Sequence, residues 1–481
     1  MGLHEVVYFH MFVRFSRSVL EIPFRSSQLI FSFRFFFSMS YSVFVTPDYL
    51  LSANINEDGD PETILRREDD KAAACSKSAG KPLKVCKFSN HSKLHFYYSP
   101  LLLGYDNLPQ GYHNPFNNEV GGCFTRIIAD NTENCAFGKK EDREKTSPIE
   151  VFKFLANTAL GKRNGNDSIA LVIPDQYRQQ QRQMIVDAFP NDNVFLIHQS
   201  VAAAYDPKFS GEQRILTIRL DDGPLQIAVH KQSDSGLQTL ASLTDATLSG
   251  LHIVKYHYLK HGDDDGYDLY EIRRDIEDIT DDDDEHEKVE ITEEHRAVIY
   301  AALQQCLAMS GCDLQDIGQV VLSGILGERI EGIKQCVADY TGKDIIIRGD
   351  EELTLNALVL MDKQKTEPGY LKQCLQTFIT VQAQDDMRAI TNLFQSFPSR
   401  HEKIETFMIA NITDEMLHAM ENSLYDSAIQ RNCQLSIAKA INHDRLATLK
   451  FSVDINFNGI ISLEITANEM DIQPRAAIKF T

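Results

Sequence analysis

The sequence predicts an α/β protein with a smaller all-β domain at its C-terminal end. Three observations support this. Buried strand patterns alternate with amphipathic helix patterns between residue 146 and about residue 360, a polar linker containing Pro368 and Gly369 follows, and only strand-like segments come after it. The chain has 481 residues, enough for roughly two to four domains of ordinary size.

Composition and charge narrow the class of protein. With 43% hydrophobic and 24% charged residues the chain resembles an ordinary globular protein, and its net charge of -21 argues against non-specific binding of duplex nucleic acid. The 9 cysteines form no CxxC pair, which argues against a disulfide framework and a tetrathiolate zinc site. We therefore expect a reducing, cytoplasmic location.

Residues 1–38 differ from the rest of the chain. They are rich in Phe, Arg and Ser, and Glu5 and Glu21 are their acidic residues. Arginines interrupt every apolar run, so no run reaches the ~18 residues of a membrane span. A mitochondrial presequence and a signal peptide are the alternatives; we expect instead that Met39 is the working start, or that residues 1–38 are a disordered extension.

The first clear elements begin at residue 146. Ser147 as N-cap, Pro148 at the first helical position and Glu150 three residues after the cap predict a helix, with apolar residues 151, 154, 155 and 159 on one face. The segments "SIALVIP" and "NVFLIHQ" are buried strand patterns, each followed by a helix pattern. This alternation predicts parallel strands with crossover helices.

The second half of the α/β region begins with "LTIRLDDGPLQIAV", residues 216–229, which predicts two strands joined by a tight turn. A long acidic segment follows, and its two acidic runs do not fit the calcium-binding EF-hand pattern, so we expect a solvated acidic loop. Next come a helix with Thr292 as N-cap and Gly311 as stop, the buried strand "QVVLSG", another helix and another strand.

The C-terminal region predicts only strands. Residues 363–370 form the expected linker, and residues 371–481 the all-β domain. Asn458 and Gly459 lie between two alternating runs, which is the strongest short signal for a β-hairpin.

Several strings resemble segments of the 70-kDa heat-shock chaperone family, in the family's order. They are "SIALVIPDQYRQQQRQ", "LIHQSVAAAY", "DATLSG", "VVLSGILGERI" and "FSVDINFNGIISLEI". The resemblance covers about residues 145–360 and 370–481. It implies an actin-like ATPase domain, a duplicated ribonuclease H-like fold, over residues 39–362, and a β-sandwich peptide-binding-type domain over residues 371–481 without the family's helical lid.

The chain departs from the family at the phosphate loops. The family's second loop, Asp-Leu-Gly-Gly-Gly-Thr, matches residues 219–224 here, which read Arg-Leu-Asp-Asp-Gly-Pro. Carboxylates facing a triphosphate cost about 1–4 kcal/mol for each close like-charge pair. The first loop is expected near residues 43–54, which contain Asp48 but no Gly-Thr pair. Gln199 replaces the catalytic Glu and cannot act as a base, and Ser200 replaces the Pro after it.

The resemblance implies ATP as the cofactor, and the departures argue against bound Mg²⁺ more strongly than against ATP. We expect no catalytic and no metal-binding residue. Each of these features also has a purely structural interpretation. Residues 221–224 would form a solvated hairpin turn, Arg273 and Arg274 would make exposed ion pairs, and His198 would be packed at the end of a strand. The residues implied to bind the nucleotide are Gly223, Arg273, Arg274, Ser323, Gly324, Gly327 and Arg329.

These features together predict a heat-shock-70-type chaperone or co-chaperone that assists nascent chains and does not hydrolyse ATP. The resemblance to lidless, ribosome-associated members implies a J-domain co-chaperone and the ribosome or a nascent polypeptide as partners, with no direct contact to nucleic acid or membrane. Two alternatives stay open. One is an active ATP-dependent chaperone whose site is rebuilt around Arg219, and the more remote one is an actin-fold small-molecule kinase.

Overall fold

A computed structural model describes the chain in two compact units, residues 1–37 and residues 38–481. The first unit contains one antiparallel hairpin of β1 (His10–Phe15) and β2 (Ser18–Pro23). All other elements belong to the second unit. The described residues are 10–15, 18–23, 40–45, 50–55, 61–65, 83–84, 95–96, 127–129, 135–137, 148–160, 167–221, 223–250, 253, 256, 291–324, 327, 330–383, 386–409, 417–423, 431–434, 445–467 and 476–477.

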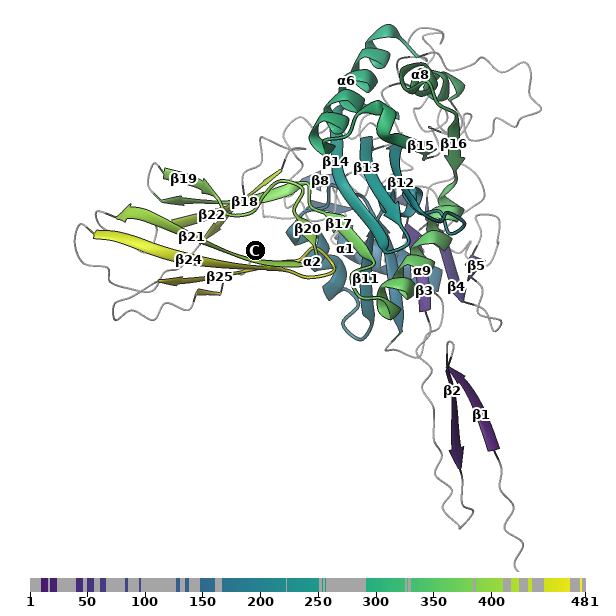
Figure 1. The fold of residues 1–481 in the computed structure, drawn as a ribbon, viewed down its shortest axis with the longest axis horizontal. Helices are drawn as coiled ribbons and strands as arrows, with labels where there is room; N and C mark the ends of the chain where they lie inside the picture. Colours follow the sequence, from purple (N-terminus) through teal and green to yellow (C-terminus); the bar gives the residue numbers. More distant parts are fainter. Residues whose placement is uncertain are drawn as a thin grey trace, which may run out of the picture. The chain divides into compact units, whose positions relative to one another are not determined.

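A five-stranded sheet in the order β11-β10-β3-β4-β5 forms the first half of the α/β body (Figure 1). β3, β4 and β5 are antiparallel neighbours, whereas β10 and β11 run parallel to β3. The strands are β3 (Ser40–Val45), β4 (Leu50–Ile55), β5 (Pro61–Leu65), β10 (Ser168–Ile173) and β11 (Asn193–His198). The helices are α1 (Pro148–Leu160), α2 (Gln179–Asp187) and α3 (Gln199–Ala204).

A seven-stranded sheet in the order β16-β15-β12-β13-β14-β17-β20 forms the second half. β12, β13 and β14 are antiparallel neighbours, and β15 and β16 extend the sheet in parallel from β12. These strands are β12 (Glu212–Arg219), β13 (Pro224–Ser233), β14 (Gly236–Ser249), β15 (Ile317–Ser323) and β16 (Ile345–Arg348). The helices are α6 (Glu293–Ser310), α8 (Glu331–Thr341) and α9 (Asp350–Thr366), with a short 3-10 helix at Leu314–Asp316.

The two halves repeat one topology. In each sheet, three antiparallel strands come first, a helix, strand, helix, strand and helix come later, and the last two strands add in parallel beside the first. In the first half, two short strand pairs lie between β5 and α1 in the chain: β6 (Leu83–Lys84) with β7 (His95–Phe96), and β8 (Ile127–Ala129) with β9 (Cys135–Phe137). The predicted α/β class and the predicted parallel strands with crossover helices are confirmed. The duplication is one of strand order and direction, and it was not visible as a repeat in the sequence.

Local signals place several element ends correctly. α1 begins at Pro148, as predicted, and buries Phe152, Ala156, Ala159 and Leu160 on one face. α6 begins after Thr292, whose hydroxyl accepts the His295 backbone N–H at 3.1 Å, and ends at Gly311 with φ 66°. The predicted cap Thr292 and the predicted stop Gly311 are thereby confirmed, whereas Ser147, the predicted cap of α1, lies outside the described residues. Such caps satisfy backbone groups that the helix itself leaves unpaired.

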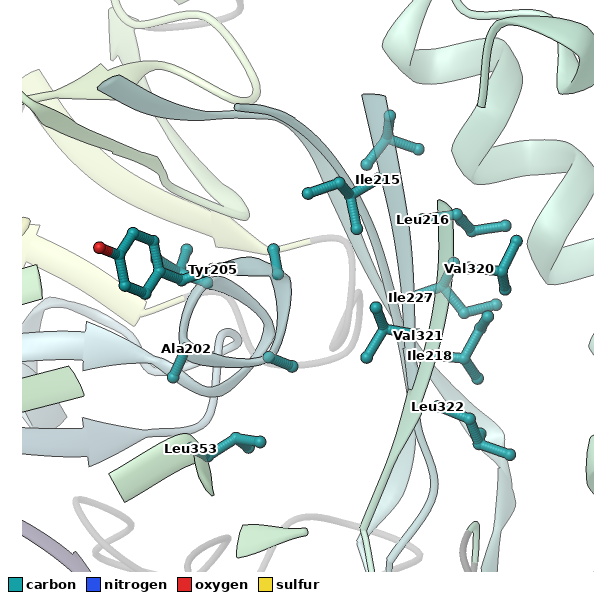
Figure 2. Packing of buried hydrophobic residues seen from close by; sticks show 14 of the residues in the cluster. Ala202, Tyr205, Ile215, Leu216, Ile218, Ile227, Val320, Val321, Leu322 and Leu353 are labelled. Carbon is teal, nitrogen blue, oxygen red and sulfur yellow. The ribbon is translucent and has the colours of Figure 1, made fainter. Parts of the chain in front are cut away.

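The core lies on both faces of the second sheet (Figure 2). Ile215, Leu216 and Ile218 on β12 are all buried although they do not alternate, because helices or strands cover both faces of this strand. The short side chains of α3, including Ala202, allow this helix to pack closely against α9. The chain therefore needs continuous apolar runs in β12 and β15, and small residues in α3.

The described residues from Leu371 onward, which we call the terminal β-region, contain only strands. Its first strand, β17 (Leu371–Cys374), pairs in parallel with β14, and β20 (Ser396–Phe397) pairs with β17, so both belong to the body's sheet. α9 extends to Thr366, which covers the start of the predicted linker. The predicted hairpin at Asn458 and Gly459 is confirmed as the turn between β24 and β25.

Two four-stranded sheets form the remainder of the terminal β-region, in the orders β19-β18-β22-β23 and β21-β24-β25-β26. The strands of the first are β18 (Thr377–Ala383), β19 (Asp386–Ala389), β22 (Leu417–Ser423) and β23 (Arg431–Gln434). Those of the second are β21 (Ser399–Ile409), β24 (Arg445–Ile455), β25 (Ile461–Ala467) and β26 (Ala476–Ala477). Across the parts of the chain described above, no helix combines the length and apolar character needed to cross a membrane.

Gly236 lets the hairpin between β13 and β14 approach the start of β17. Its φ is 149°, and a Cβ there would lie 2.2 Å from the carbonyl oxygen of Tyr370, which accepts the Leu237 N–H at 2.8 Å.

We expect Gly236→Ala to lower the free energy of unfolding by about 2–4 kcal/mol through overpacking and backbone strain. Urea unfolding measures this. The control is Gly342→Ala, where φ is 64° and nothing lies within 4 Å of the added Cβ, so the expected loss is only about 1–2 kcal/mol. Equal losses would contradict the close approach.

Candidate functional site

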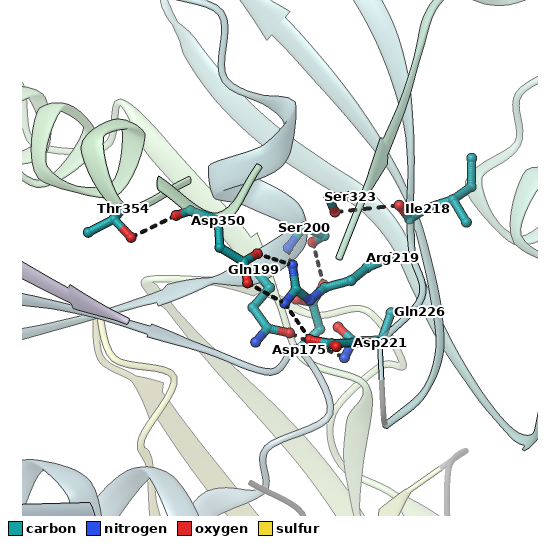
Figure 3. A network of polar contacts seen from close by, with 10 residues as sticks. All are labelled: Asp175, Gln199, Ser200, Ile218, Arg219, Asp221, Gln226, Ser323, Asp350 and Thr354. Carbon is teal, nitrogen blue, oxygen red and sulfur yellow. Dashed lines mark hydrogen bonds and ion pairs between the residues drawn. The ribbon is translucent and has the colours of Figure 1, made fainter. Parts of the chain in front are cut away.

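A buried polar cluster lies where the turn after β12 meets the starts of α3 and α9 (Figure 3). α3 follows the last strand of the first repeat and α9 follows the last strand of the second. The first residues of these helices, Gln199 and Asp350, therefore occupy matching positions in the two repeats. Each contacts a residue of the β12–β13 hairpin, so the hairpin faces both helix starts.

Arg219, the last residue of β12, is the centre of the cluster. Its guanidinium is 4% exposed and donates to both Asp350 carboxylate oxygens, Nη1 to Oδ1 at 2.7 Å and Nη2 to Oδ2 at 3.3 Å. Nη2 also donates to Asp221 Oδ2 at 2.8 Å, and the guanidinium carbon lies 5.2 Å from the ring centroid of Phe44. Arginine's planar fork fits a carboxylate in this two-bond geometry. The cation is thus engaged by acids of its own chain.

Gln199, at the start of α3 in the first repeat, makes the matching contact with Gln226 on β13 of the second repeat. Gln226 Nε2 donates to Gln199 Oε1 at 3.3 Å, and both side chains are buried. An amide has no basic lone pair suited to accept a proton from an attacking water. This position therefore holds a neutral contact between the repeats and supplies no general base.

Asp175 is a buried acid that the sequence analysis did not single out. Its carboxylate accepts the Ser200 backbone N–H at 3.2 Å, the Ser200 hydroxyl, and the Ser242 hydroxyl at 2.9 Å. Burial raises the pKa of Asp175, and the hydrogen bonds from Ser200 and Ser242 oppose that rise. Because Ser242 belongs to β14, this acid joins the two repeats. Its position directly after the strand "SIALVIP" was the available signal.

The residues implied to bind the adenosine have structural contacts here. Ser323 Oγ donates to the Ile218 carbonyl at 3.5 Å, and the Gly327 N–H donates to the Leu220 carbonyl at 3.0 Å. Gly324 has φ 89°, and a Cβ there would lie 2.5 Å from the Leu220 oxygen. These three residues hold the segment after β15 against the turn after β12.

Of the other four residues implied to bind the nucleotide, the structure describes Gly223. Gly223 lies in the β12–β13 turn, and nothing is within 4 Å of where its Cβ would be. Arg273, Arg274 and Arg329 lie outside the described residues, as do Asp48 and Asp222. The structure therefore brings Ser323, Gly324 and Gly327 beside the Arg219 cluster.

Further hydrogen bonds join β16 and α9 of the second repeat to the end of α3 in the first repeat. Arg348, at the end of β16, donates to the carbonyl oxygens of Ala203, at 2.7 Å, and Tyr205. Asn356 on α9 donates to the carbonyls of Ala202 at 3.0 Å and Tyr205 at 3.2 Å. These carbonyls at the end of α3 have no partner within their own helix, so α9 and β16 cap it.

The described charged groups at the β12–β13 turn are paired with each other. A phosphate clamp needs free backbone N–H groups, a cation or a bound metal. Arg219 is already paired with two carboxylates. Within the described ranges no group of three or more His, Cys, Asp or Glu side chains is placed to hold a metal ion.

His198 and His230 are fully buried histidines near the cluster. The Arg182 guanidinium contacts His198 Nε2 at 2.6 Å, and both burial and this cation lower the pKa of His198. His198 is therefore a packed strand-end residue, as predicted. The ring of His230 lies between the hydroxyls of Thr217, at 3.1 Å, and Thr239, at 3.2 Å.

Comparison with known proteins gives no assignment: neither a family model nor a curated protein matches this chain.

Removing the Arg219 cation tests how much the Arg219–Asp350 ion pair contributes to stability. Arg219→Met leaves the buried Asp350 carboxylate without its two-bond partner, so we expect the free energy of unfolding to fall by about 3–5 kcal/mol. Asp350→Asn in the same background restores part of this loss, because the unpaired charge disappears. A double-mutant cycle in urea measures the coupling, and additive losses would contradict a direct ion pair.

The pH dependence of stability tests the burial of His230. Burial lowers the pKa of His230 from 6.5 to about 3, so between these values the unfolded chain binds a proton that the folded chain does not. Stability therefore falls on acidification, by about 1.4 kcal/mol per pH unit for this residue. We expect His230→Gln to make the slope of unfolding free energy against pH shallower by about one proton between pH 4 and 6. The slope above pH 7.5 should stay unchanged, and an unchanged slope at low pH would contradict the prediction.

Proposed function

We propose that this protein is a heat-shock-70-type chaperone or co-chaperone with a degenerate, non-hydrolysing nucleotide site. Three observations support the family. Five strings resemble the family in order along the chain. The body repeats one strand and helix order twice, which fits an actin-like, duplicated ribonuclease H-like fold. Two four-stranded sheets follow the body, which fits a β-sandwich substrate-binding-type domain.

The cluster around Arg219 carries the proposal that ATP is not hydrolysed. At the position where the family resemblance puts a magnesium-holding Asp and a glycine-rich loop, this chain has a guanidinium bonded to Asp350 and Asp221. A cation there cannot hold Mg²⁺, and Gln199 supplies no base. The site is thereby closed by contacts within the chain, and the body acts as a scaffold.

The proposed partners and location rest on the family resemblance. They are a J-domain co-chaperone and the ribosome or a nascent polypeptide, in the cytoplasm. An acidic chain with net charge -21 fits a role in which another protein, rather than this chain, contacts ribosomal RNA. Co-purification of a J-domain protein and ribosomal subunits with the tagged chain tests this, and the absence of both would contradict it.

Nucleotide binding gives the direct test of the closed site. We expect millimolar MgATP to leave the melting temperature unchanged, since a ligand at 100 times its Kd would add about 2.7 kcal/mol of stability. We also expect no ATP turnover above background. A saturable stabilisation of the wild-type chain, with turnover that Asp48→Ala abolishes, would instead support an active ATPase.

Chaperone activity is measured separately from nucleotide binding. We expect the full chain to bind an extended apolar peptide in fluorescence anisotropy, and the affinity to be the same with and without MgATP. An ATP-dependent affinity would contradict the uncoupled scaffold. Absence of both peptide binding and partner co-purification would contradict the chaperone proposal itself.

A further inference from the structure

Asn458 and Gln373 together cover the free edge of the first sheet. β11 is an outer strand of that sheet, so its outward backbone groups have no strand beside them. Asn458 Oδ1 accepts the Leu196 N–H at 2.9 Å, and Asn458 Nδ2 donates to the Val194 carbonyl at 2.9 Å. Gln373 Oε1 accepts the His198 N–H at 2.7 Å, and Gln373 Nε2 donates to the Leu196 carbonyl at 2.8 Å. Two carboxamides thus supply the alternating donors and acceptors that a paired strand would supply.

Gln179 makes the same kind of contact in the opposite direction. It lies on α2 of the body, and its Oε1 accepts the Ile461 N–H at 2.7 Å while its Nε2 contacts the Ile461 carbonyl at 3.4 Å. Ile461 is the first residue of β25 in the terminal β-region. The amide contacts therefore run from each part to the backbone of the other.

The turn that carries Asn458 is shaped for this contact. Asn456 Oδ1 accepts the N–H groups of Asn458, at 2.9 Å, and Ile460, at 3.0 Å. Gly459 has φ 71°, and a Cβ there would lie 2.9 Å from Arg182 Nη1. Arg182 is buried and donates to the Asn458 carbonyl at 3.2 Å, so the body contacts both the backbone and the side chain of the turn.

We propose that the Asn458 and Gln179 carboxamides, beside the Gln373 carboxamide of β17, attach the two four-stranded sheets of the terminal β-region to the body permanently, without a bound nucleotide. A carboxamide donates and accepts at once, so one side chain satisfies an N–H and a carbonyl of a strand edge. A carboxylate of the same shape only accepts, and it would leave a buried carbonyl unpaired. Arg219, Asp221 and Asp350 make none of these bonds, and the proposal does not rest on the proposed chaperone function.

Hydrogen exchange of the full chain tests the attachment. We expect Asn458→Asp and Gln373→Glu to speed exchange of the Leu196 and His198 amides about 10- to 100-fold, because each variant leaves a β11 carbonyl, Val194 or Leu196, without its donor and so weakens the contact with the edge. Gln179→Glu touches no atom of β11, yet undocking should speed exchange there to a similar degree. Gln183→Glu adds the same charge to α2 at a side chain bonded to Asp187, and should change nothing.

Amides paired between β24 and β25 report whether the terminal β-region stays folded. If Asn458→Asp also speeds exchange of the β24–β25 amides, the terminal β-region itself has been destabilised. The Gln179→Glu result then tests the attachment, since that variant leaves the sequence of the terminal β-region unchanged. Unchanged β11 exchange in Gln179→Glu, or in both other variants, would overturn the proposal. A change of β11 exchange in the wild-type chain on adding MgATP would also overturn it, because permanent attachment requires none.

Discussion

The ion pair between Arg219 and Asp350 is the constraint on which the centre of the body depends. A buried guanidinium is tolerated only when it is paired and hydrogen-bonded, and Arg219 reaches two carboxylates and the face of Phe44. The pair joins the end of β12 to the start of α9 across 131 positions of sequence. Because Asp350 begins α9, which also packs on α3 and β3, this one pair fixes the hairpin against elements of both repeats.

Polar contacts between the repeats then follow a common principle. Asp175 with Ser242, Gln199 with Gln226, and Arg348 with the end of α3 each satisfy groups that the fold would otherwise bury unpaired. The terminal β-region is attached in the same way, by amides at a strand edge. A body closed by its own side chains has less need of a ligand to hold its halves together, which is consistent with the scaffold role proposed for it.

Much of the fold could be predicted because its signals are local. Pro148, Thr292 and Gly311 act on backbone groups within a few residues, and Asn458 with Gly459 suits a tight turn directly, so the sequence located these ends. The candidate site was located by its order among the elements. The pairing of Arg219 with Asp350, the role of Asp175 and the use of Gln373 were missed, because each depends on a partner brought close only by folding.

The sequence by itself determined the alternation of strands and helices and the all-β character of the described C-terminal part. Only the tertiary structure decided that the linker region continues into the body's sheet and that Arg219 pairs with Asp350 and Asp221. The repeated strand order, which the family resemblance implied, could not be seen as a repeat in the sequence. The physical reason is the sequence separation of the interacting residues. Capping, turn formation and periodicity act between neighbours in sequence, whereas buried ion pairs and contacts at strand edges depend on which distant segments meet.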